Sequence, residues 1–186
     1  MSKIFVDLDD TVTRLAPFLL QTMMERKGVV LDNWEELCRT REVYRFQNLS
    51  EEHPLGSMRG NEVFDLLKEE DFYTRYPLLL QPSEIVSLIW SKNYSELVFT
   101  SVTLPQHLKS KQEWLGKNFP GIDYNFIAFE SDADKIDYLK KVKYDLYCDD
   151  QLSLLQAGGV PAEACMTFNR GYIKPTGKET LLKIHY

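Results

Sequence analysis

The chain has 186 residues, and its 22 Lys and Arg against 28 Asp and Glu give a net charge of −6. This charge disfavours a general nucleic-acid binder, because such a protein needs a basic surface. A hydrophobic content of 44% allows one folded domain with a small insertion, and no apolar run is long enough to span a membrane. No signal peptide is recognisable, and three scattered cysteines without metal-ligand spacing favour a reduced, cytoplasmic protein.

The first predicted element is a short buried strand over residues 4–7, which begins with the apolar run Ile4-Phe5-Val6. Asp7 and Asp9 come at its end, and residues two apart in an extended chain share a face. Two carboxylates held this close repel each other unless a cation lies between them, and Mg²⁺ is often bound by one or two carboxylates and a substrate phosphate. If the two acids stood alone, an Asp-rich turn would be the preferred interpretation.

Residues 16–76 are predicted to form a small helical unit inserted into the chain. Apolar residues cluster from Ala16 onward, and Lys27-Gly28 is typical of a helix C-terminus. Asp32 or Asn33 can cap the next helix. Helices are expected over residues 16–27, 34–44 and 61–67, with a loop over residues 47–60 and an aromatic link over residues 72–77.

The rest of the chain alternates between helix and strand patterns. Such alternation predicts an α/β fold: a Rossmann-like parallel sheet with helices on both faces. Ligands bind beyond the carboxyl ends of the strands in sheets of this kind, so the residues that follow each strand are the candidates for function. Strands are expected over residues 96–100, 124–129, 145–148 and 164–168, and helices over residues 83–93, 106–118, 135–143, 152–157 and 178–184.

The residues at these positions are the parts of a phosphoryl-transfer site. A carboxylate can attack phosphorus and a second one can move protons, while Mg²⁺, hydroxyl groups and a lysine hold the phosphate oxygens. The set consists of Asp7 and Asp9 after the first strand, Thr100 and Ser101 after the second, Lys135 where a helix begins, and Asp149 and Asp150 after the fourth strand.

Taken together, these motifs resemble the haloacid dehalogenase superfamily of phosphatases. The resemblance rests on hhhDxDxT at residues 4–11, hhhTS at residues 97–101, the helix-opening Lys135, and hhhDD at residues 146–150, in the order of that superfamily. One departure is Asp10, where many members have glycine; aspartate tolerates turn conformations, so the change is mild. The resemblance implies a catalytic core over residues 1–15 and 77–186, with residues 16–76 as a helical cap over the active site.

The resemblance also implies a role for each residue. Asp7 would be the nucleophile that forms an aspartyl-phosphate, and Asp9 the general acid and base. Thr100, Ser101 and Lys135 would bind phosphate. The Mg²⁺ ligands would be Asp7, Asp9 through its backbone carbonyl, Asp149 and Asp150, with Asp150 the more direct ligand of the last two.

A finer resemblance is to the 5'(3')-deoxyribonucleotidases. It rests on residues 70–78, on Phe99-Thr100-Ser101, and on the run from Lys111 to Leu115, but residues 80–83 lack a glycine expected there. The predicted function is therefore a Mg²⁺-dependent phosphomonoesterase whose substrate is a small phosphate monoester, a deoxyribonucleoside monophosphate. The alternatives are a phosphatase for another ester such as a sugar phosphate, a phosphotransferase, and a non-catalytic phosphate-binding module. A homodimer is one of the assemblies left open.

Three residues are predicted to contact the rest of the substrate: Leu15, which follows the first motif, and Tyr44 and Phe46 at the end of the second cap helix. An aromatic ring can stack on a base, although aromatic residues of a small helical unit are more often core. Lys109 is predicted to be a solvated surface lysine, and Lys111 is left open between that role and the phosphate entrance. The histidines at positions 53, 107 and 185 are predicted to be on the surface.

Overall fold

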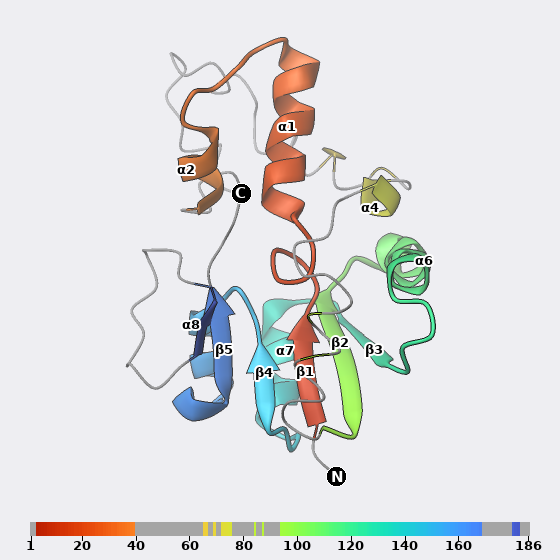
Figure 1. Ribbon diagram of the computed structural model, residues 1–186, viewed down its shortest axis with the longest axis vertical. Helices are drawn as coiled ribbons and strands as arrows, with labels where there is room; N and C mark the ends of the chain where they lie inside the picture. The colour runs from red at the N-terminus through yellow and green to blue at the C-terminus, as the bar shows by residue number, and fades with distance from the viewer. Residues whose placement is uncertain are drawn as a thin grey trace.

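The computed structural model describes residues 3–39, 65, 66, 69, 72–75, 84, 87, 94–168 and 180–182. Within this part of the chain, six strands form one parallel sheet in the order β3-β2-β1-β4-β5-β6 (Figure 1). The predicted Rossmann-like α/β class is confirmed. None of the described helices is long and apolar enough to cross a bilayer.

The strands follow the predicted pattern except at the C-terminal end of the chain. A helix was predicted over residues 178–184, but Thr180–Leu182 is the edge strand β6, which pairs with Met166 to Phe168 of β5. A short apolar run does not distinguish helix from strand by itself, and here pairing with the open edge of β5 decides the outcome. The strands are β1 (Lys3–Asp7), β2 (Glu96–Val102), β3 (Asn125–Phe129), β4 (Leu146–Cys148), β5 (Cys165–Phe168) and β6 (Thr180–Leu182).

The helices that surround the sheet begin and end at recognisable signals. Helix α1 ends at Gly28, as the Lys27-Gly28 pair predicted, and the φ of 63° at Gly28 is in the left-handed region. Helix α7 begins three residues before the predicted start, because the Ser131 hydroxyl accepts a hydrogen bond from the Asp134 N–H. The helices are α1 (Leu15–Lys27), α2 (Trp34–Arg39), α4 (Phe72–Arg75), η3 (Pro105–His107), α6 (Leu108–Asn118), α7 (Asp132–Leu139), α8 (Leu152–Ala157) and η4 (Ala162–Ala164).

Both faces of the sheet are buried, so the alternation of side chains along β1 separates two cores. Ile4 and Val6 face a core that includes Trp114 and Leu115 of α6. Phe5 faces a second core with residues of α7 and α8. The three cysteines of the chain, Cys38, Cys148 and Cys165, are buried thiols that form no disulfide.

Helices α1 and α2 lie beyond the carboxyl ends of the strands, above the arrowheads of β1 and β4 in Figure 1. The described part of the predicted cap consists of α1, α2 and α4. The predicted loop over residues 47–60 lies outside the described residues, as do the helices over residues 61–67 and 83–93 apart from single positions. The domain boundaries at residues 16 and 76 stay predictions.

Candidate active site

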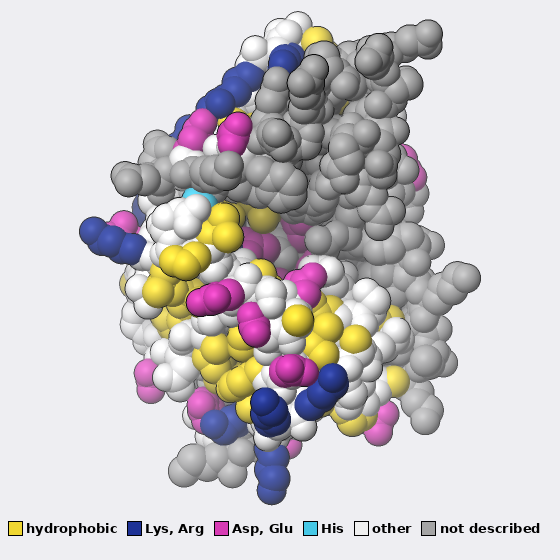
Figure 2. Space-filling model, turned by 180° about the vertical axis from the view of Figure 1, so that it is seen from behind, with side chains coloured by type: hydrophobic (Ala, Val, Ile, Leu, Met, Phe, Trp, Pro, Cys, Tyr) yellow, Lys and Arg dark blue, Asp and Glu magenta, His cyan; other side chains and the backbone are white. Residues whose placement is uncertain are grey.

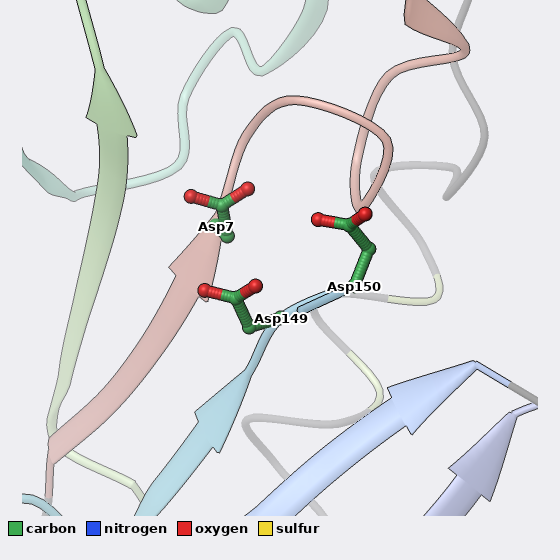
Figure 3. Close-up of side chains that lie close together, drawn as sticks. All are labelled: Asp7, Asp149 and Asp150. Atoms are coloured by element: carbon green, nitrogen blue, oxygen red, sulfur yellow. The ribbon is translucent and has the colours of Figure 1, made fainter. Parts of the chain in front are cut away.

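Three buried carboxylates meet at the carboxyl ends of two neighbouring strands. Asp7 is the last residue of β1, and Asp149 and Asp150 follow β4, which pairs in parallel with β1. One oxygen of each carboxylate lies within 4.8 Å of the others, and Figure 3 shows the three side chains gathered around one space. The relative exposures of these residues are 5%, 0% and 1%, so their charges are removed from water.

Lys135 is the cation of this cluster. Its Nζ donates to Asp7 Oδ1 at 2.6 Å and to Asp149 Oδ2 at 2.8 Å, and the side chain is 2% exposed. Burial alone would lower the pKa of Lys135, but the carboxylates of Asp149 and Asp7 hold it well above its ordinary value. Burial raises the pKa of Asp7 well above its ordinary value; Lys135 opposes this rise, and Asp149 and Asp150 add to it. A single lysine therefore does not neutralise the cluster.

Hydrogen bonds fix the loop after β4. The Asp149 N–H donates to Met166 O at 3.0 Å, and Asp149 Oδ1 accepts from the Gln151 N–H at 2.7 Å. The Asp150 N–H donates to Thr11 Oγ1 at 2.9 Å. The threonine of the first motif therefore holds the backbone that carries Asp150, which was not predicted from the sequence.

Asp9 points to a different set of partners. Its Oδ2 accepts from Ser101 Oγ at 2.8 Å and from Lys111 Nζ at 2.7 Å. Lys111, left open by the sequence, is buried and belongs to the site. A signal for this existed, because Lys111 lies three and four residues before Trp114 and Leu115, on the buried face of α6. Lys109 is a surface lysine as predicted, with 88% of its side chain exposed.

Asp10 replaces the glycine of the motif for a visible reason. Its φ of 56° lies in the left-handed region, which aspartate tolerates better than most residues. Its Oδ1 accepts from the Ala16 N–H at 2.7 Å, at the first turn of α1. The extra carboxylate therefore satisfies an N–H of the first turn and stabilises the start of α1.

These groups surround a cavity of about 120 Å³. Pockets that enclose a whole small molecule usually measure about 300–1,000 Å³, so this cavity matches a phosphoryl group and its nearest atoms. On the face seen in Figure 2, acidic side chains gather in and around a recess at mid-height. The cavity is lined by Asp7, Asp9, Asp10, Leu15, Val102, Asp132, Lys135, Asp150 and Gln151.

The predicted site residues fall into three groups. Asp7, Asp9, Leu15, Lys135 and Asp150 line the cavity. The side chains of Thr100, Ser101 and Asp149 are buried behind it: Thr100 Oγ1 lies 2.7 Å from the Tyr147 hydroxyl, and Ser101 donates to Asp9. Tyr44 and Phe46 lie outside the described residues.

The surface prediction for His107 is wrong. The residue is 1% exposed, and its ring packs edge-on against Tyr73 with centroids 4.8 Å apart. It belongs to η3, the turn that leads into α6 and faces α4. Burial lowers the pKa of His107, and the nearby Lys111 ammonium lowers it further. His53 and His185 lie outside the described residues.

Comparison of the sequence with known proteins finds a distant relative. No protein-family model matches the sequence. A protein of Oceanobacillus iheyensis with the name "Putative nucleotidase OB0422" is 23% identical over 159 residues, which are 83% of this chain and 80% of that protein.

Solved structures of the same architecture are more distant in sequence. The haloacid dehalogenase-like hydrolase SP0104 of Streptococcus pneumoniae superposes with a TM-score of 0.59 at 12% identity, over 98% of this chain and 93% of that chain. CbbY of Rhodobacter sphaeroides, solved with phosphate, gives 0.56 at 14% identity over the same shares of the two chains. YfnB of Bacillus subtilis, solved with magnesium, gives 0.55 at 11% identity, over 97% and 93%. The chain therefore has the fold of the haloacid dehalogenase-like hydrolases, in agreement with the order of its motifs.

Proposed function

We propose that the protein is a Mg²⁺-dependent phosphomonoesterase that works through an aspartyl-phosphate on Asp7. The observation that supports this most is the placement of Asp7 in the cavity between Lys135 and two further carboxylates, at the carboxyl edge of a parallel sheet. Asp7 is the proposed nucleophile and Lys135 the proposed phosphate-binding cation, and Asp9, the proposed proton-transfer group, lines the same cavity.

The reaction follows from two of the carboxylates that line the cavity, those of Asp7 and Asp9. Asp7 attacks phosphorus, the bond from phosphorus to the ester oxygen breaks, and the Asp9 carboxyl gives its proton to the leaving alkoxide. Asp9 then takes a proton from the water that attacks the aspartyl-phosphate, which releases inorganic phosphate and restores Asp7. Lys135 is placed to hold phosphate oxygens while it keeps Asp7 oriented.

The charges of the site fit a divalent cation. Asp7, Asp9, Asp149 and Asp150 can carry four negative charges, and the buried lysines 111 and 135 carry two positive ones. Asp149 already accepts hydrogen bonds on both of its oxygens, so we assign it to orienting Lys135. Asp7, Asp150 and the backbone carbonyl of Asp9 are left as the ligands for Mg²⁺, which when bound supplies charge neutralisation for the phosphate oxygens.

The proposed substrate is a deoxyribonucleoside monophosphate. The relative named as a nucleotidase supports this choice, and Leu15 lines the cavity where the first atoms beyond the phosphate would lie. The rest of the substrate extends toward the cap, where Tyr44 and Phe46 are the proposed base contacts. The cytoplasmic location and the homodimer stay predictions.

The test is the release of inorganic phosphate from a panel of nucleoside monophosphates, sugar phosphates and p-nitrophenyl phosphate. Activity should require Mg²⁺, disappear with EDTA, and be highest on deoxyribonucleotides. Phe46→Ala and Tyr44→Ala should lower kcat/KM on nucleotides by about ten- to a hundredfold and leave the aryl ester nearly unchanged. A preference for sugar phosphates would contradict the substrate, and Mg²⁺-independent activity would contradict the metal.

A further inference from the structure

A second buried lysine, Lys111, comes from α6, which packs on the face of the sheet opposite to α7, the helix of Lys135. Lys111 is 1% exposed, and its Nζ donates to Asp9 Oδ2 at 2.7 Å, to Ser101 Oγ at 2.7 Å and to Val102 O at 3.4 Å. An ammonium has three protons, so these contacts use its full donor capacity. The other two lysines of α6, Lys109 and Lys117, are exposed. Of the three, Lys111 alone is directed at a cavity residue.

The cap side of Lys111 is covered by an aromatic ring. Nζ lies 4.4 Å from the centroid of the Tyr73 ring, a distance at which a cation is attracted to a ring face. Tyr73 is 6% exposed and belongs to α4, which packs on α6. Phe72, next to it, packs against Phe18 of α1 with centroids 5.1 Å apart. Contacts therefore run without a gap from α1 and α4 through Tyr73 and Lys111 to Asp9.

This arrangement restricts where the Asp9 carboxylate can point. Ser101 and Lys111 both donate to the same oxygen, Oδ2, and Thr103 Oγ1 donates to Ser101 Oγ at 2.9 Å, which holds Ser101 in turn. If the Asp9 side chain turned away, the buried Lys111 ammonium would lose this acceptor, and Oδ2 accepts hydrogen bonds whether or not the other oxygen carries a proton, so the contacts favour this rotamer. A general acid must lie within hydrogen-bond reach of the leaving oxygen, and a shift of about 1 Å is costly.

We propose that Lys111 is a positioning residue that orients the Asp9 carboxyl toward the leaving-group oxygen. Through Tyr73, this orientation depends on how α4 packs against α6. The inference rests on the proposed function, because it takes Asp9 as the proton donor. An alkoxide leaving group needs that proton, whereas p-nitrophenolate departs without it. A misplaced Asp9 carboxyl therefore slows the hydrolysis of alkyl esters more than the hydrolysis of the aryl ester.

The experiment compares kcat/KM for a deoxyribonucleoside 5'-monophosphate and for p-nitrophenyl phosphate. For each ester, kcat/KM reflects the steps up to departure of the leaving group, so the later hydrolysis of the aspartyl-phosphate does not affect it. Lys111→Met should lose at least about tenfold more on the alkyl ester than on the aryl ester, since proton transfer contributes about 10²–10⁴-fold. Lys109→Met, on the same helix but exposed, should leave both values unchanged. Equal losses of Lys111→Met on both esters would mean that Lys111 has only a structural role, and would overturn the proposal.

Tyr73 supplies the second variant, and it decides the matter if Lys111→Met does not fold. Tyr73→Leu removes the ring and should show the same split between the esters with a smaller size, while Tyr73→Phe keeps the ring and should restore wild-type behaviour. Equal losses of Tyr73→Leu on both esters would overturn the link to α4. A wild-type protein that hydrolyses neither ester would refute the proposed function itself, whereas an active protein without the split would refute this inference alone.

Discussion

Two buried lysines form ion pairs with carboxylates of one cavity, and they face different surroundings. Lys135, from α7, bridges two carboxylates, Asp7 and Asp149. Lys111, from α6, bridges one carboxylate, Asp9, and one hydroxyl, Ser101. Both side chains are at most 2% exposed, so the difference lies in the partners rather than in burial.

The difference shows how similar parts serve different purposes. Around Lys135 the carboxylates outnumber the cation, and the pKa of Asp7 stays well above its ordinary value because of burial and the neighbouring acids. That side of the cavity needs a further positive charge, and it suits metal and phosphate. Around Lys111 the single carboxylate is matched, and a hydroxyl, a carbonyl and a ring fill the remaining positions. That side suits the orientation of a proton-transfer group.

The largest expected effect comes from substituting Asp7 on the acid-rich side of the site, which consists of Lys135 and the carboxylates of Asp7, Asp149 and Asp150. Asp7→Asn keeps the shape of the side chain but removes the attacking oxygen charge and one proposed metal ligand. Hydrolysis should fall by at least about a thousandfold, the size expected when a catalytic group is lost. Steady-state phosphate release measures the effect. Near-normal turnover of the variant would rule out a covalent intermediate on Asp7.

A smaller effect is expected when one proposed Mg²⁺ ligand, Asp150, is removed. Asp150→Ala should raise the Mg²⁺ concentration needed for half-maximal activity by about ten- to a hundredfold, because it removes one proposed ligand from the cluster. Asp137→Ala is the matched control, since Asp137 is an exposed acid of α7 that pairs with Lys140. A titration of activity with Mg²⁺ distinguishes the two, and an unchanged requirement in Asp150→Ala would remove that residue from the ligand set.

The acid-rich side also predicts a dependence of stability on pH. Because the pKa of Asp7 is raised above 3.8 on folding, the metal-free folded protein holds this proton more tightly than the unfolded chain. The stability that this group contributes is therefore complete below its unfolded pKa and is lost as pH rises through its folded pKa. Without metal, Asp7→Asn should be the more stable protein near neutral pH, with a Tm higher by roughly 2–4 °C for about 1 kcal/mol.

Calorimetry in EDTA, from about pH 5 to about pH 8, tests this dependence. The Tm of the wild type should approach that of Asp7→Asn at the acidic end, and Mg²⁺ should stabilise the wild type more than the variant. A metal-free wild type that is more stable than Asp7→Asn at neutral pH would show that Lys135 alone compensates the buried charge.

The smallest effect concerns the hydrogen bond between the hydroxyl groups of Thr100 and Tyr147. Tyr147→Phe removes the partner that lies 2.7 Å from Thr100 Oγ1. It should lower the free energy of unfolding by about 1 kcal/mol, the usual net contribution of one hydrogen bond. If Thr100 also binds phosphate, Thr100→Val raises KM while Tyr147→Phe does not. Equal KM values in both variants would assign the Thr100 hydroxyl to structure alone.

The sequence by itself determined five of the six described strands and the acids at their carboxyl ends. Apolar runs with polar residues at their ends predicted β1, β2 and β4, and parallel order brings those ends to one edge. Asp7, Asp9 and Asp150 were identified in this way, because position after a strand is a local property of the chain. The end of α1 at Gly28 was also predicted, because the pair Lys27-Gly28 is typical of a helix C-terminus.

The tertiary structure alone decided which partners these residues have. Lys111 and Asp9 are 102 positions apart, and periodicity shows only that Lys111 lies on the buried face of α6. Likewise the burial of His107 depends on α4, and the strand at residues 180–182 depends on the open edge of β5. Each of these outcomes is a contact between distant segments, whose free energy is set by packing and desolvation at a place that no local pattern specifies.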